Sequence, residues 1–72
     1  MGLDPQRRLA LAELRARIRA LNLADYQIWL IYLRCGGDGE LLSFQAYLYG
    51  ALDLSDSDWA ALRHSVWEAE TL

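Results

Sequence analysis

The 72-residue chain contains no lysine and only one cysteine, one proline and one histidine. A single cysteine excludes an internal disulfide. Cys35 and His64 are the only soft metal ligands, and neither has a second ligand at the spacing of a structural zinc site, so we expect no metal and no cofactor. A domain of this size buries too little surface to be strongly stable alone. These absences favour association with another chain.

Membrane-spanning and secretory signals are also missing from the sequence. No stretch approaches the roughly 18 consecutive apolar residues needed to cross a bilayer, and residues 1–5 lack the charged and apolar regions of a signal peptide. We therefore expect a cytoplasmic protein. The seven basic residues are all arginine, beside ten alanines and fifteen leucines. Because lysine codons are rich in A and T, this bias indicates a GC-rich bacterial genome.

The longest apolar run is residues 28–33, IWLIYL, which carry no charge. As a helix this segment would be apolar on nearly every side, and such a helix has to be enclosed. Hydrophobic residues make up 54% of the chain, which leaves apolar surface for a contact with another protein. We therefore predict a homodimer or a permanent protein partner, with a compact monomer as the alternative.

The pattern of apolar, capping and turn residues predicts a single all-α domain, 1–72, with the second of four helices at its centre. The helices are expected at about 5–21, 23–35, 40–49 and 56–70. Glycines end the second and third helices, and a polar residue is expected to cap each helix start. The predicted caps are Asp4 (ahead of Pro5), Asn22, Asp38 and Ser55.

Apolar stripes at helical spacing predict the core. The first helix has Leu11, Leu14, Ile18 and Leu21 on one face, and the fourth has Trp59, Leu62, Val66 and Ala69. The third helix carries two ridges: Leu41, Phe44, Leu48 and Leu52 form one, and Leu42, Ala46 and Tyr49 form the other.

A bundle this small can cover one ridge of a short helix, so we expect the second ridge to be exposed and to mark an association site. The alternative is that both ridges are core. The candidate interface consists of Leu42, Ala46, Tyr49 and Trp67, with Trp29 or Tyr32 at its edge.

Residues 28–37, IWLIYLRCGG, followed by residues 44–52, FQAYLYGAL, resemble a group of short actinobacterial proteins. Those proteins have a helix containing tryptophan and leucine, a Gly-Gly turn, and an Ala-Tyr-Leu helix closed by glycine. The resemblance covers about residues 25–68 and implies a helical fold and an actinobacterial source. It carries over no catalytic residue. Cys35 and the acidic segment 53–58 depart from the pattern.

No set of residues in the sequence converges for catalysis. Cys35 is expected at a helix C-terminus, where the helix dipole disfavours a reactive thiolate, and His64 is expected on the outer face of the fourth helix. We interpret them as a small edge cysteine and a surface histidine. The acids in segment 53–58 lack the glycine and glutamate of a calcium loop. We therefore expect no enzymatic activity.

Charge is distributed unevenly along the chain. Residues 1–24 carry a formal charge of +3 and residues 25–72 one of −6. Arg8, Arg15 and Arg19 share one flank of the first helix, which makes anion or nucleic-acid binding the alternative to a protein-interaction function. The net charge of −3 and the lack of base-reading side chains on the third helix argue against nucleic acid as a partner.

Overall fold

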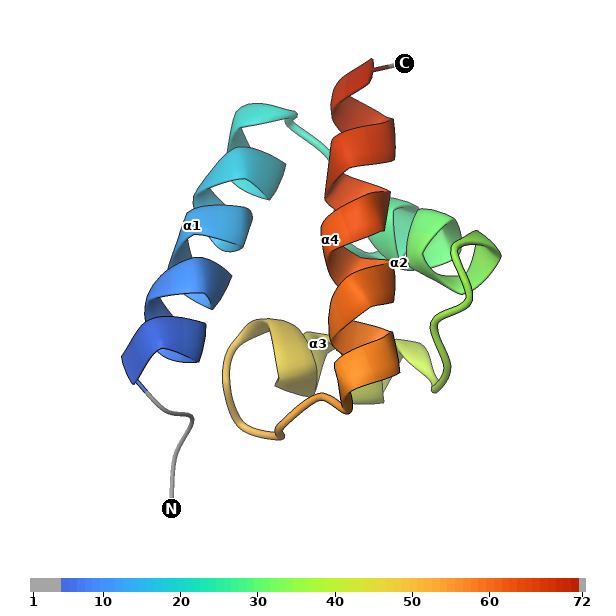
Figure 1. Ribbon diagram of the computed structural model, residues 1–72. Coiled ribbons are helices and arrows are strands. Elements are labelled where there is room, and N and C mark those ends of the chain that lie inside the picture. Colours follow the sequence, from blue (N-terminus) through green and yellow to red (C-terminus); the bar gives the residue numbers. More distant parts are fainter. Residues whose placement is uncertain (1–4, 72) are drawn as a thin grey trace.

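The computed structural model describes residues 5–71 and consists of helices and connecting loops over that range (Figure 1). It confirms the predicted all-α bundle. The helices are α1 (Pro5–Ala20), α2 (Asp25–Arg34), α3 (Leu41–Leu48) and α4 (Asp56–Thr71). Helices α1 and α4 run side by side in the same direction, α2 crosses behind α4, and α3 lies near the start of α4 (Figure 1).

The core is built where all four helices meet, and the predicted stripes of α1 and α4 contribute to it. Its buried hydrophobic residues are Leu11, Leu14, Ile18, Ile28, Tyr32, Phe44, Leu48, Leu54, Ala61, Leu62, Val66 and Ala69. Helix α2 packs against both α3 and α4, which agrees with its expected central position. Helix α4 shares this position because it packs against both α1 and α2.

Helices α2 and α3 both end in the hydrogen-bonded turn in which glycine adopts a positive φ. After α2, Gly36 has φ 97°, and the Gly37 N–H donates to the Tyr32 carbonyl oxygen at 2.9 Å. After α3, Gly50 has φ 82° and the following Ala51 N–H donates to the Ala46 carbonyl oxygen at 2.8 Å. The glycines therefore end the helices as predicted.

The structure confirms one predicted helix cap and corrects two. The Ser55 hydroxyl accepts the Asp58 N–H at 3.2 Å at the start of α4, as expected. Asn22 does not cap α2: it follows α1 with φ 60°, and Ala24 precedes α2 instead. Likewise Glu40, and not Asp38, precedes α3. The predicted cap at Asp4 lies outside the described residues.

Ion pairs at both ends join α1 to the acidic C-terminal part of the chain. The Arg7 guanidinium donates to the Leu54 carbonyl oxygen and to the Asp56 carboxylate, each at 3.1 Å. Near the other end, Arg17 Nε donates to Glu70 Oε2 at 2.9 Å. The uneven charge of the sequence is thus partly neutralised within the fold.

Within the part of the chain that the structure describes, each helix is too short or too polar to cross a membrane.

Candidate functional site

The second ridge of α3 is largely uncovered. Leu42 is 76% exposed and Tyr49, directly after the helix, is 58% exposed, while Ala46 between them is half-buried. The first ridge faces the core through Phe44 and Leu48, but Leu52 lies beyond the end of α3 and is exposed, contrary to expectation. The two-ridge alternative, in which both rows are core, is therefore wrong.

A matching exposed row runs along α2. Tyr26, Leu30 and Leu33 are exposed and follow one another at intervals of four and three residues, which places them on one side of the helix. This row was not part of the predicted interface, because an all-round apolar helix was expected to be enclosed. Its signal was present in the sequence as the surplus of apolar residues in segment 28–33.

The two rows lie on the same side of the molecule. Asp25 at the start of α2 accepts hydrogen bonds from Gln45 Nε2 at 3.2 Å and from the Tyr49 hydroxyl at 3.4 Å, so the start of α2 meets the end of α3. The two helices are antiparallel neighbours, and both turn their buried side chains toward the core. Their exposed rows therefore point away from the core on adjacent helices. The Trp29 side chain joins α2 to the loop before α3 by donating to the Gly39 carbonyl oxygen at 3.2 Å.

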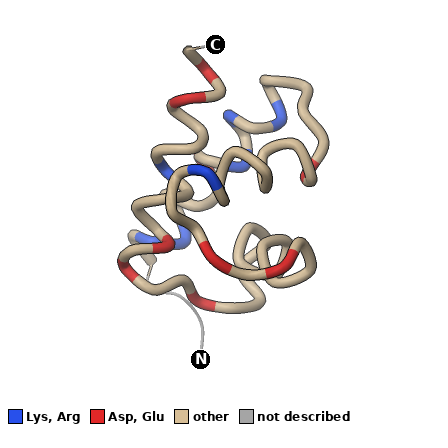
Figure 2. Tube along the Cα trace, turned by 90° about the vertical axis from the view of Figure 1, so that its right-hand side faces the viewer, with Lys and Arg blue, Asp and Glu red and all other residues tan. Residues whose placement is uncertain are grey.

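We call this surface the α2–α3 apolar face. It consists of Tyr26, Leu30, Leu33, Leu42, Ala46 and Tyr49. In Figure 2 the helix α3 itself is tan, and acidic positions lie in the loop that leads into it. Six uncovered or half-buried apolar side chains on two adjacent helices of a chain this small are the kind of surface that marks an association site.

Two residues predicted for the interface do not belong to it. Tyr32 is 0% exposed: its ring packs on Phe44 with centroids 4.9 Å apart, and burial raises its pKa to about 12. Trp67 is exposed, but it lies on the outer face of α4 beside His64, with ring centroids 5.5 Å apart. It is roughly 16 Å along the helix from the end that lies near α3 (Figure 1).

The predicted arginine flank is divided in the structure. Arg15 turns toward α3 and donates to the Leu48 carbonyl oxygen at 2.9 Å. Arg15 and Arg19 both line a pocket of about 150 Å³, together with Asp25 and Tyr49. Arg8 is exposed two turns earlier on α1 and is not among the residues that line this pocket.

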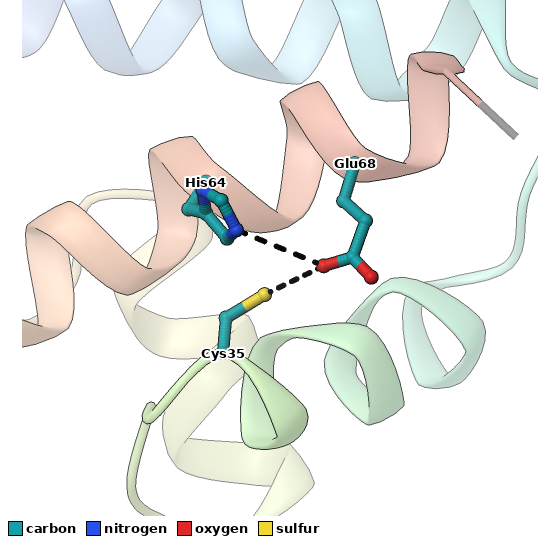
Figure 3. Close-up of side chains that lie close together, drawn as sticks. All are labelled: Cys35, His64 and Glu68. Atoms are coloured by element: carbon teal, nitrogen blue, oxygen red, sulfur yellow. Dashed lines mark hydrogen bonds and ion pairs between the residues drawn. The ribbon is translucent and has the colours of Figure 1, made fainter.

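Cys35 and His64, 29 positions apart, meet where α2 ends against α4 (Figure 3). Glu68, for which the sequence predicts no role, lies between them. The Cys35 thiol donates to Glu68 Oε2 at 3.1 Å, and His64 Nε2 is 3.9 Å from the same oxygen. Arg34 Nη2 approaches the other oxygen, Oε1, at 3.5 Å.

Burial raises the pKa of the Cys35 thiol to about 11, and the neighbouring Glu68 carboxylate acts in the same direction. The metal-free thiol is therefore protonated at neutral pH and is a poor nucleophile. The four-residue interval between His64 and Glu68 was the available sequence signal. It became informative only once the fold placed Cys35 opposite.

No family model, curated protein or solved structure matches this chain. The resemblance to short actinobacterial proteins, and the source that it implies, stay predictions.

Proposed function

We propose that this protein is a non-enzymatic interaction module that forms a homodimer through the α2–α3 apolar face. The observation that carries this proposal is the exposure of two apolar rows on adjacent helices. Burying one large apolar side chain against a partner is favourable by roughly 1.5–3 kcal/mol relative to leaving it in water.

The charge pattern supports a second copy as the occupant. A two-fold contact brings each group of the face near its own counterpart, so a charged face would repel itself. The six side chains of the α2–α3 apolar face are uncharged, and the adjacent Asp25 carboxylate is already hydrogen-bonded to Gln45 and Tyr49. Self-association therefore carries little penalty from like charges.

The required area is compatible with one face of this molecule. A standard interface covers about 800 Å² on each partner, and the chain has 4661 Å² of accessible surface. Roughly a sixth of the accessible surface of each copy would be buried in such an interface.

The test is the solution mass by light scattering over a hundredfold range of concentration, with Leu42→Glu as the variant. We expect a wild-type mass near twice 8.2 kDa and a dissociation constant raised more than about a hundredfold in Leu42→Glu, since the substitution acts once in each copy. Leu9→Glu is the matched control, because Leu9 is similarly exposed (72%) but lies on α1. This substitution should leave the dimer intact.

Two results would overturn the proposal. One is a wild-type mass of a single chain at every concentration, in which case a different protein would have to cover the face. The other is a dimer that Leu42→Glu weakens no more than Leu9→Glu does, which would place the contact elsewhere on the molecule.

A second candidate function is anion or nucleic-acid binding, favoured by the position of Arg15 and Arg19 on one pocket. The Asp25 carboxylate in the same pocket weakens this candidate. The double variant Arg15→Gln/Arg19→Gln should abolish low-salt binding to RNA, DNA or anionic vesicles, whereas Arg63→Gln on α4 should not. A wild-type protein that binds none of these three at low salt would refute it.

A further inference from the structure

Three side chains with metal-binding atoms converge between α2 and α4, on the side of α2 that faces α4 and away from the α2–α3 apolar face. Cys35 Sγ, a His64 ring nitrogen and a Glu68 carboxylate oxygen all lie within 4.8 Å of one another. His64 and Glu68 are one turn apart on the same side of α4, and Cys35 directly follows the last residue of α2. Two packed helices therefore hold the three groups, as Figure 3 shows.

Two of the three separations are close to those of a tetrahedral zinc site. With bonds of about 2.0–2.3 Å to nitrogen, oxygen and sulfur, neighbouring ligand atoms lie about 3.3–3.6 Å apart. The observed distances from Glu68 Oε2 are 3.1 Å to Cys35 Sγ and 3.9 Å to His64 Nε2. Each of these two differs from the ideal by roughly half an ångström. The third separation, between Cys35 Sγ and the His64 ring nitrogen, is within 4.8 Å. Rotation of the exposed His64 side chain would bring its nitrogen closer to the other two ligands.

We propose that Cys35, His64 and Glu68 bind one Zn²⁺ ion per chain through Sγ, Nε2 and Oε2, with water in the fourth position. The proton that the Cys35 thiol now donates to Glu68 would leave to solvent, so that the thiolate and the carboxylate both face the ion. A thiolate and an imidazole together select zinc over magnesium or calcium, which prefer oxygen ligands.

Neighbouring groups already orient two of the ligands. Arg34 is 3.5 Å from Glu68 Oε1 and so leaves Oε2 directed toward the other two ligands. The Trp67 ring lies beside the His64 ring, with centroids 5.5 Å apart, and contacts one side of it. Such supporting contacts typically contribute 10–100-fold to metal affinity.

The experiment uses Co²⁺ as a spectroscopic probe for Zn²⁺ on the full chain, stripped of metal and kept reduced. We expect a thiolate-to-cobalt charge-transfer band and the visible bands of tetrahedral cobalt, both saturating at one ion per chain. Adding Zn²⁺ should abolish both. Zn²⁺ should also raise the thermal unfolding temperature, because it binds the folded state preferentially.

Variants separate a three-ligand site from a cysteine that binds metal alone. Cys35→Ser should lose the charge-transfer band, while His64→Ala and Glu68→Gln should each weaken Co²⁺ binding at least about tenfold. Glu70→Gln is the matched control, since Glu70 lies on the same helix but pairs with Arg17, and it should bind Co²⁺ as the wild type does. Circular dichroism establishes that each variant is folded.

Three outcomes would overturn the proposal. One is the absence of a thiolate-to-cobalt band at saturating Co²⁺. Another is undiminished affinity in both His64→Ala and Glu68→Gln. The third is one ion bound per two chains, because the site would then form between copies. The first two outcomes do not bear on the proposed homodimer, since Leu42 lies outside the cluster. The third would indicate a contact between copies at the cluster, and the Leu42→Glu variant distinguishes that contact from the proposed one.

Discussion

The adjacent glycines Gly36 and Gly37 should respond to alanine for different physical reasons. Gly36 has φ 97° and open space around it, so Gly36→Ala strains only the backbone, at about 1–2 kcal/mol. At Gly37, an added Cβ would overlap three atoms of the buried Tyr32 ring. Overpacking of this kind costs about 1–3 kcal/mol, a large share of the roughly 4–11 kcal/mol expected for a chain of this length.

Because these two costs overlap in size, the decisive measurement is a double-mutant cycle with Tyr32→Leu, which removes the obstructing ring. Urea unfolding, followed by circular dichroism with a stabilising osmolyte present, gives the free energy of unfolding of each variant. In the Tyr32→Leu background we expect Gly37→Ala to lose most of its cost, a coupling of about 1–3 kcal/mol. The cost of Gly36→Ala should be unchanged. Additivity of Gly37→Ala with Tyr32→Leu within about 0.5 kcal/mol would refute the steric explanation.

Three further predictions concern single contacts. The pKa of metal-free Cys35 is raised from 9.0 to about 11. At pH 8 its thiol should therefore react with iodoacetamide on the order of a hundredfold more slowly in the folded chain than in the unfolded chain. Equal reaction rates would contradict the burial of Cys35. The hydrogen bond from Arg17 lowers the pKa of Glu70. This pair therefore stabilises the fold at pH values above the ordinary glutamate pKa, and its contribution is lost as the pH falls through the lowered pKa. Arg17→Gln should therefore flatten this part of the profile of unfolding free energy against pH, and an unchanged profile would exclude the pair as its source. Ser55→Ala should lower the free energy of unfolding by about 1 kcal/mol, because it removes the cap of α4. Ser57→Ala should have little effect on the free energy of unfolding, and equal losses in the two variants would argue against capping by Ser55.

The helices and most of the core could be predicted from the sequence because their signals are local. The stripes of α1 and α4 repeat every three to four residues, and Gly36, Gly50 and Ser55 act on backbone groups within five positions of themselves. The incorrect cap at Asn22 has a local cause as well. The residue follows one helix and precedes another, and its positive φ shows that it ends the first helix.

The candidate sites depended on tertiary structure because their members are distant in the sequence. The periodicity of apolar residues identified two ridges on α3, but the positions of α2 and α4 decide which ridge is buried. The same packing decides that Tyr32 is buried. The composition showed that the chain has more apolar residues than a small core needs. Only the fold showed that the apolar side chains left exposed on α2 and α3 form the α2–α3 apolar face. Cys35 and Glu68 are 33 positions apart, so no spacing rule could join them. The sequence by itself determined the four helices and the ends at Gly36, Gly50 and Ser55, since these depend on neighbouring residues. Packing decided which side chains meet and which remain exposed, because both follow from contacts between helices.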